Sequence, residues 1–289
     1  MTEEPPSQAN VQRPERLFRY FHPGHSRIFI EQKLWFSSAS DFNDIFEAVP
    51  RFDQIIPEMT EKARRINYAF LPPEVGLNFS SYNARTKEFH HQVVESTHDE
   101  YPETFQRKFS LHAGIVCFSA HLDSLLMWGH YTDCHRGFVL EFDPRHALFP
   151  PRDFAKVRYD ENRPVMTVET TSEVLLFKSP EWRYEDEYRL VKQKAELTKG
   201  TRIRNGENIE GHYLRLPMDS IKAVYLGCRI EKNDRENLIK PLEAYPHIKR
   251  FFMRKNRVAY KLDVVPWDDW TEPSGVVESA LNRPLGNFK

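Results

Sequence analysis

The segment that runs from residue 182 to residue 191, WRYEDEYRLV, constrains the fold of this chain most strongly. Charged and apolar residues alternate along it, and this alternation predicts a β-strand whose successive side chains point to opposite faces. Glu185, Glu187 and Arg189 would then share one face, while Tyr188 and Leu190 share the other. Such a strand is either a ladder of ion pairs on a solvated surface or one wall of an active-site cleft, and the pattern alone leaves both open.

The composition indicates a globular protein with a sizeable core. The chain has 289 residues, of which 40% are hydrophobic and 13% aromatic, and its 20 prolines outnumber its 11 glycines. These values favour a packed α+β body over a repeat architecture. We therefore predict a disordered tail over residues 1–14, a single α+β domain over 15–268 and a second tail over 269–289.

The charge balance gives no global attraction to a polyanion. The formal net charge is −1, from 41 Lys and Arg against 42 Asp and Glu. A balanced net charge is still compatible with a local basic patch. No stretch approaches the roughly 18 apolar residues of a membrane helix, and the first residues lack the basic and apolar parts of a signal peptide. We expect a soluble, cytoplasmic protein without a membrane partner. Its three cysteines, outside any Cys-x-x-Cys spacing, predict neither a disulfide framework nor a structural zinc site.

The apolar periodicity predicts a mixed, mainly antiparallel sheet with flanking helices. Residues about 57–108 are charge-rich, with apolar positions such as Phe89, Val93 and Val94 at helical spacing, and are interpreted as a helical insertion. The strands are short and follow no regular βαβ rhythm. Strands are expected at 17–21, 34–38, 114–119, 137–142, 155–159, 185–192, 213–216, 223–227 and 258–264, and helices after Ser26, around 122–131 and at 234–245.

Several side chains around these strands are candidates for ligand binding. Arg19 and Tyr20 lie in the first predicted strand, where an inward-facing Arg needs an anionic partner and an outward-facing one is merely a surface residue. Lys178 and Trp182 flank the turn before the charged strand, where Trp182 can form the wall of a site for a flat ring.

Two further segments have both a structural and a functional interpretation. The polar stretch with Ser37, Ser38, Asn43 and Asp44 is either a capped turn or a loop that offers hydroxyl, amide and backbone N–H groups to a polar ligand. Trp128 and Tyr131 are three residues apart on a predicted helix. Aromatic pairs at this spacing line a pocket or belong to the core.

Standard cofactor motifs are missing. His130 and His135 are five residues apart, unlike the i, i+4 pair that places two imidazoles on one helix face for zinc. Asp44 and Glu47 offer carboxylate oxygens, but two such ligands alone are a weak metal signal. No dinucleotide-binding glycine motif, phosphate-binding loop or nucleophile elbow occurs.

Nine short blocks follow one another in a specific order along the chain. They are LFRY (17–20), LWFSS (34–38), FNDIFE (42–47), CFS (117–119), MWGHY (127–131), HRGF (135–138), KS (178–179), WRYEDEYR (182–189) and YLG (225–227). This order resembles a bacterial family known as domain of unknown function 2971. The resemblance extends from about residue 17 to residue 265 and implies an architecture rather than an activity. One departure is Ile45, where the family usually has proline.

A more distant resemblance is to ADP-ribosyltransferases, which place an Arg or His on the first core strand, a Ser motif on a following strand and a Glu at the end of a Glu-x-Glu pair on a later strand. The matching positions here are Arg19 or Tyr20, then Ser37 and Ser38, then Glu187 preceded by Glu185. This resemblance implies NAD as substrate, a protein or nucleic-acid acceptor, and a role as a toxin-like effector in bacterial conflict or defence.

The roles that this resemblance implies suit the residues chemically. Glu187 would stabilise the oxocarbenium character of the ribose, and Glu185 would position or deprotonate the acceptor. Arg19 would bind the pyrophosphate, and Tyr20 or Trp182 would stack on a ring. Two alternatives stay open. One is a metal-dependent nuclease or hydrolase that uses Asp44, Glu47, Glu185 and Glu187, although no metal is expected, and the other is a non-catalytic nucleotide- or protein-binding module.

Overall fold

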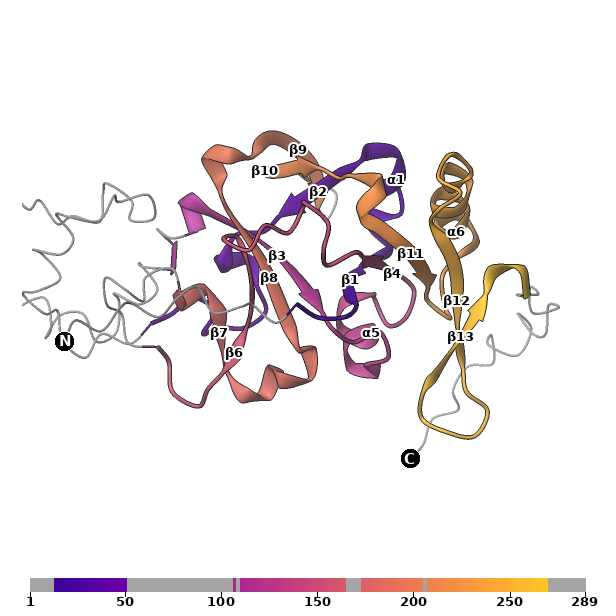
Figure 1. Ribbon diagram of the computed structural model, residues 1–289, viewed down its shortest axis with the longest axis horizontal. Coiled ribbons are helices and arrows are strands. Elements are labelled where there is room, and N and C mark those ends of the chain that lie inside the picture. Colours follow the sequence, from indigo (N-terminus) through magenta and orange to yellow (C-terminus); the bar gives the residue numbers. More distant parts are fainter. Residues whose placement is uncertain (1–12, 51–105, 108–109, 165–172, 205–206, 270–289) are drawn as a thin grey trace, which may run out of the picture.

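The computed structural model describes residues 13–50, 106–107, 110–164, 173–204 and 207–269. It shows a mixed α+β protein built on a mainly antiparallel open sheet (Figure 1). The predicted insertion at 57–108 and the two predicted tails lie almost entirely outside these residues. Within the described part of the chain, no helix is long and apolar enough to cross a membrane.

The main sheet has eight strands, and all but one of its neighbouring pairs are antiparallel. The parallel pair is β11 with β12. In spatial order the strands are β13 (Leu262–Pro266), β12 (Lys249–Lys255), β11 (Ile221–Leu226), β4 (Phe138–Phe142), β1 (Leu17–Phe21), β3 (Ala113–Ser119), β8 (Glu187–Gln193) and β5 (Phe154–Lys156).

The remaining described strands form two smaller sheets. An antiparallel sheet of three strands has the order β2 (Lys33–Phe36), β10 (Glu207–Arg215), β9 (Thr198–Arg204). A parallel pair joins β6 (Arg158–Tyr159) to β7 (Phe177–Lys178). Ser37, just after β2, makes a bridge with Ile115 of β3 and so ties the three-stranded sheet to the main one.

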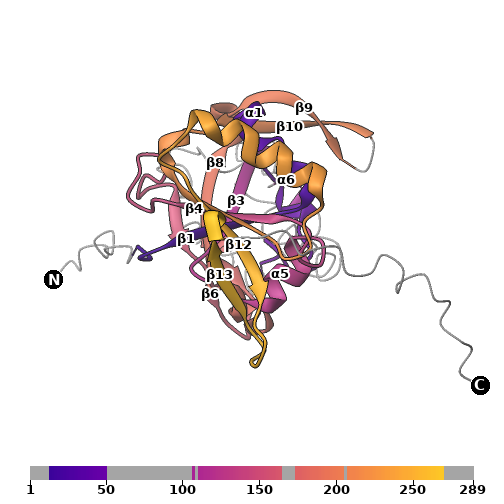
Figure 2. The same ribbon diagram turned by 90° about the vertical axis from the view of Figure 1, so that its right-hand side faces the viewer.

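Helices cover both faces of the main sheet (Figure 2). Because side chains alternate along β1, Phe21 packs in the same core cluster as Leu238 of α6 (Lys232–Ile239), whereas Phe18 packs in the cluster of Trp128 on α5 (Leu125–Tyr131). A short α1 (Ile28–Glu31) precedes β2. Single 3-10 turns are η1 (Pro23–His25), η2 (Ala39–Asp41), η4 (Glu173–Leu176), η5 (Pro180–Glu185), η6 (Lys194–Glu196), η7 (Met218–Ser220), η8 (Lys240–Ala244) and η9 (Trp267–Asp269).

The charged segment at 182–191 differs from the prediction in its first half. Residues Pro180–Glu185 form the 3-10 turn η5, Asp186 adopts a left-handed conformation with φ 39°, and the strand begins only at Glu187. Pro180 favours the start of such a turn, and Asp tolerates left-handed backbone better than most residues. The prediction that Glu185 and Glu187 share a strand face is therefore wrong.

Two other predicted elements have different bounds in the structure. The strand expected at 258–264 is replaced by the hairpin of β12 and β13, with Val258 in its exposed turn. The strand β12 was missed because its cationic residues hide the apolar alternation of Phe251 and Met253. The helix expected at 234–245 ends at Ile239 and continues as η8.

The main sheet opens between β1 and β3. These neighbours pair only at Phe18 and Ser119, whereas β1 pairs with β4 over five residues and β3 pairs with β8 over seven. Backbone groups on the facing edges of β1 and β3 thus separate along most of their length. This opening places side chains from the centre of the sheet around a cavity.

Candidate functional site

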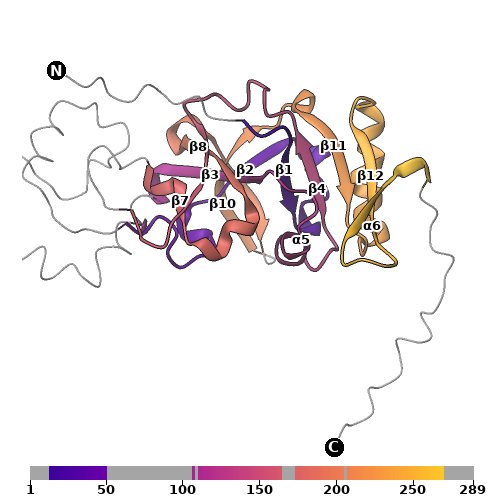
Figure 3. The same ribbon diagram turned by 60° about the horizontal axis from the view of Figure 1, so that its bottom comes forward.

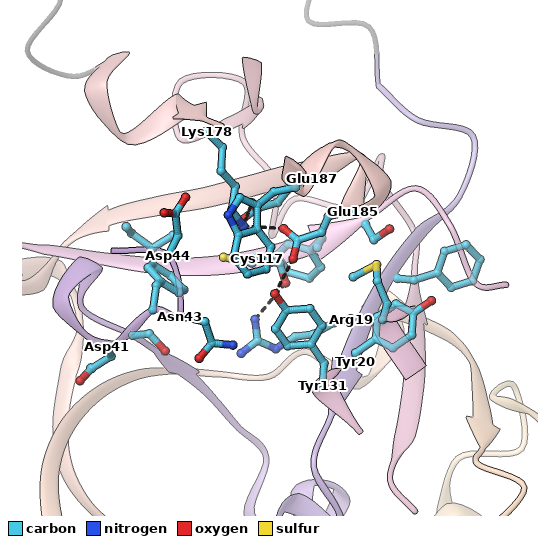
Figure 4. A pocket seen from close by; sticks show the side chains of 18 residues that line it. Arg19, Tyr20, Asp41, Asn43, Asp44, Cys117, Tyr131, Lys178, Glu185 and Glu187 are labelled. Atoms are coloured by element: carbon cyan, nitrogen blue, oxygen red, sulfur yellow. Dashed lines mark hydrogen bonds and ion pairs between the residues drawn. The ribbon is translucent and has the colours of Figure 1, made fainter. Parts of the chain in front are cut away.

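A cavity of about 260 Å³ lies where β1 and β3 diverge (Figure 4). Residues from β1, β3, the loop after β2, α5, β7, the turn η5 and the start of β8 surround it. Its lining comprises Phe18, Arg19, Tyr20, Ser37, Asp41, Phe42, Asn43, Asp44, Ile115, Cys117, Phe118, Ser119, Met127, Tyr131, Lys178, Trp182, Glu185 and Glu187.

Most of the site residues predicted from sequence meet at this cavity. Arg19, Ser37 and Glu187, which come from three different strands or strand ends, all line it. The other predicted residues on the lining are Tyr20, Asn43, Asp44, Tyr131, Lys178, Trp182 and Glu185. The divergence of β1 from β3 explains how neighbours Arg19 and Tyr20 both reach the cavity.

A buried ion-pair network supports one side of the cavity. Arg189 is 0% exposed and donates from Nη1 and Nη2 to the two carboxylate oxygens of Glu47, at 2.5 and 2.8 Å. Its Nε donates to Glu187 at 2.8 Å. Bidentate Arg–carboxylate pairs fix geometry well, so Arg189 orients Glu187 and anchors the segment around Glu47 that follows the cavity loop.

Lys178 joins the two carboxylates of the Glu-x-Glu pair. Its Nζ lies 2.5 Å from Oε2 of Glu185 and 3.1 Å from Oε2 of Glu187. The hydroxyl of Tyr131 also donates to Glu185. The two carboxylates thus meet at one ammonium group, although a 3-10 turn carries the first and a strand carries the second.

The surroundings drive the pKa values of these two carboxylates in opposite directions. Burial opposes ionisation of Glu187, but attraction to Arg189 and then to Lys178 holds its pKa at about 2. Burial raises the pKa of Glu185, and Lys178 only partly offsets this rise. Lys178 itself is desolvated, yet Glu187 and Glu185 raise its pKa. Divergent pKa values in a carboxylate pair are a common basis for dividing acid–base and electrostatic roles.

The opposite side of the cavity carries Arg19, a cation without an acidic partner among the described residues. Its Nη1 donates to the backbone oxygen of Cys117 at 3.1 Å, and its Nε has no hydrogen-bond partner in the described structure. The guanidinium lies over the rings of Phe21 and Phe118, at 5.1 and 5.9 Å from their centroids. Desolvation lowers the pKa of Arg19 to about 10, so it is charged at neutral pH.

Three predicted site residues do not line the cavity. Trp128 is fully buried and donates through Nε1 to Leu122 at 2.7 Å, so its predicted role in a pocket is wrong and it belongs to the core. Arg189 lies behind Glu187. The Ser38 hydroxyl accepts from Lys194 at 2.8 Å, and Ser38 is not part of the cavity lining.

Cys117 was missed as a site residue, since the sequence marks it only as a small buried hydrophobe. It lies on β3, on the same side as Arg189 in the register of β3 with β8, and it lines the cavity. Burial raises the pKa of its thiol, and the neighbouring Glu187 adds to the rise. A protonated thiol is a poor nucleophile, so Cys117 serves as a neutral neighbour of Glu187.

The carboxylates of the metal-dependent alternative are engaged in other contacts. Asp44 accepts from the backbone N–H of Phe46 at 2.9 Å, and Glu47 accepts from Arg189. Glu185 and Glu187 share Lys178. Among the described residues, no group of three or more His, Cys, Asp or Glu side chains is arranged to hold a metal ion.

Comparison with known proteins supports the family resemblance over part of the chain. A family model described as "Protein of unknown function (DUF2971)" matches residues 127–190. The matched segment includes most of α5 with Tyr131, the strand β7 with Lys178 and both carboxylates of the Glu-x-Glu pair. No curated protein matches the chain significantly, and neither does any solved structure.

Proposed function

We propose that this protein binds NAD or a related nucleotide in the cavity and cleaves the bond between its ribose and its base. The observation that carries this proposal is the placement of Glu185 and Glu187 across one cavity from Arg19, whose charge no described acid neutralises. A nucleotide matches such a cavity because it joins an anionic phosphate to a sugar whose cleavage develops positive charge.

The size of the cavity suits one half of a dinucleotide. Its volume of about 260 Å³ lies just below the roughly 300–1,000 Å³ of ordinary small-molecule pockets. The aromatic residues Phe42, Tyr131 and Trp182 line it and supply faces for a flat base. We therefore place the ribose and the leaving base inside, with the phosphate at Arg19.

The two carboxylates divide the chemistry between them. Glu187 stays ionised and is held by Arg189, so it provides a fixed negative charge beside the oxocarbenium-like ribose. Glu185 has the higher proton affinity and takes the proton of the attacking hydroxyl. The acceptor oxygen then bonds to the anomeric carbon, while the glycosidic bond breaks and the base leaves as a neutral molecule with the bonding electron pair.

The purified full chain incubated with NAD tests this proposal through the release of free nicotinamide. We expect release to fall about 100-fold or more in Glu187→Gln and in Glu185→Gln, as for loss of a major electrostatic or acid–base group. The control is Glu181→Gln, the same change at an exposed carboxylate of the turn η5. Equal release by Glu187→Gln and the unmodified protein would contradict the proposed mechanism.

Calorimetry with NAD on the same sample separates binding from turnover. NAD binding without nicotinamide release would instead identify a non-catalytic nucleotide-binding module. If nicotinamide is released, the distribution of ADP-ribose between water and added protein or nucleic acid identifies the acceptor. A toxin-like role in bacterial conflict further predicts growth arrest on expression, relieved by Glu187→Gln.

A further inference from the structure

The hairpin of β12 and β13 carries a dense group of cations that the cavity does not use. Residues 249–261, KRFFMRKNRVAYK, contain six basic residues and no acidic residue, within a chain whose net charge is −1. The hairpin is at one edge of the main sheet, at the end of the molecule where α6 lies (Figure 3), and its turn extends past α5 at the lower right of Figure 1.

Four of these cations surround the end of the hairpin. Arg254, Lys255, Arg257 and Lys261 are exposed, and none forms an ion pair with a described residue. Arg254 and Lys255 are consecutive on β12 and so point to opposite faces of the ribbon. A polyanion can therefore contact the hairpin from either face.

The turn also presents a fully exposed aromatic ring. Tyr260 is 101% exposed and Val258 is 97% exposed. A tyrosine ring this exposed is available to stack on a flat partner, and every nucleic-acid base has such a face.

The turn is ordered by its own hydrogen bonds rather than by packing. Asn256 accepts through Oδ1 from the backbone N–H groups of Val258 and Ala259, at 2.9 and 2.7 Å. Its amide nitrogen donates to both carboxylate oxygens of Asp263, at 3.0 and 3.1 Å. These contacts order the backbone of the turn that presents Tyr260, which lowers the entropic cost of binding.

A second cavity lies at the other end of β12. Its volume is about 420 Å³, and its lining includes Arg16, Lys222, Lys249 and Phe251 together with the acidic Glu141 and Asp219. Arg16 pairs with Glu141 at 2.9 Å, so one of the two acids is neutralised. The seven residues of β12 span roughly 20 Å between this cavity and the turn, which is enough for several nucleotides.

We propose that the β12–β13 hairpin binds single-stranded nucleic acid, with its four exposed cations on phosphates and Tyr260 stacked on a base. Cations outnumber exposed apolar side chains at the turn and occupy both faces, which suits a strand better than a flat lipid surface. The inference is independent of nucleotide cleavage in the cavity, because the binding is measured without NAD.

Fluorescence anisotropy of labelled 12-nucleotide RNA and DNA single strands, with the full chain at 50–200 mM salt, tests this inference. We expect Arg257→Gln with Lys261→Gln to weaken binding about tenfold and to reduce the slope of log K against log salt by about 1.4. We expect Tyr260→Ala to weaken binding about tenfold with an unchanged slope. Better binding of RNA than of DNA, or the reverse, would identify the preferred strand.

The matched control removes two exposed cations elsewhere, Arg152→Gln with Lys232→Gln, and should leave binding unchanged. Equal loss in this control would overturn the inference, since binding would then follow overall charge. Two other results would also overturn it: tighter binding of a duplex with no effect of Tyr260→Ala, and binding to phosphatidylserine vesicles without binding to either single strand. Unchanged melting temperatures show that each variant is folded.

Discussion

The two sides of the cavity differ in whether their charged side chains form ion pairs. On the side of β7, η5 and β8, the carboxylates of Glu185 and Glu187 and the cations of Lys178 and Arg189 are joined by ion pairs at 2.5–3.1 Å. On the side of β1, Arg19 has only a backbone oxygen as a polar partner among the described residues. The charges on the first side are paired with one another, whereas Arg19 has no acidic partner among the described residues.

This difference separates a supporting role from a ligand-binding role. Burying an ion pair costs desolvation energy, which the attraction between its two charges offsets. Removing one member therefore leaves a buried charge without compensation. A lone Arg gains its best partner only when an anion binds. Substitutions on the first side should therefore change mainly the free energy of unfolding and the pKa values of the carboxylates. Substitutions of Arg19 should change mainly the affinity for the ligand.

The strongest test of the paired side is Arg189→Met. It should lower the free energy of unfolding by about 3–5 kcal/mol, because Glu47 stays buried without its cation and Glu187 keeps only Lys178 among the described cations. Denaturant unfolding measures this change. Arg27→Met is the control, since Arg27 forms an exposed pair with Glu31 and should cost at most about 1 kcal/mol. Equal losses in the two variants would show that the network adds no stability.

The pH dependence of stability tests the same side. The pKa of Glu187 is about 2 in the folded protein against 4.5 for the free group, so the unfolded chain takes up this proton first. The contribution of Glu187 is therefore present above about pH 4.5 and is lost as the pH falls toward 2, by roughly 3 kcal/mol. The raised pKa of Glu185 acts in the opposite sense.

Because of this opposition, the informative quantity is the difference in pH slope between the unmodified protein and Glu187→Gln. Urea unfolding between pH 2 and 6 provides it. The variant should lose less stability on acidification. Identical slopes would mean that Glu187 is not held ionised by its neighbours.

The unpaired side is tested by Arg19→Gln. Loss of a charged hydrogen-bond donor should weaken nucleotide binding by about 1.5–3 kcal/mol, or roughly 10–100-fold, with little change in stability. Calorimetry with NAD measures the affinity. The control is Arg16→Gln, which removes an Arg paired with Glu141 outside the cavity. Unchanged affinity in Arg19→Gln, or an equal loss in Arg16→Gln, would remove Arg19 from the binding site.

The smallest effect is expected from Tyr131→Phe. The hydroxyl of Tyr131 bonds to Glu185 and lowers the pKa of that carboxyl, against the larger effect of burial. Its removal should move the acidic limb of nicotinamide release to higher pH, with a cost of about 1 kcal/mol. Tyr184→Phe is the control, because that hydroxyl contacts His130 at 3.1 Å. A shift of the limb to lower pH would contradict this role for Tyr131.

Sequence patterns predicted the class of fold, and they named many of the residues that line the cavity. Alternation correctly placed Glu187 and Arg189 on one face of a strand and Tyr188 and Leu190 on the other, since strand geometry depends only on local spacing. The same rule misplaced Glu185, because a proline turn and a left-handed Asp186 precede the strand. The alternation rule also failed to predict β12, because the cations of this projecting hairpin strand hide its apolar alternation.

The chain by itself determined which side chains are available: the Glu-x-Glu pair, the Arg of the first strand, the polar loop after the second and the basic run near residue 255. Only the tertiary structure decided how their charges are used. Pairing of Arg189 with Glu47, 142 residues away along the chain, depends on long-range packing that no local pattern contains. The same is true of the divergence of β1 from β3, which turns a continuous sheet into a cavity and leaves Arg19 without an acidic partner in the described structure.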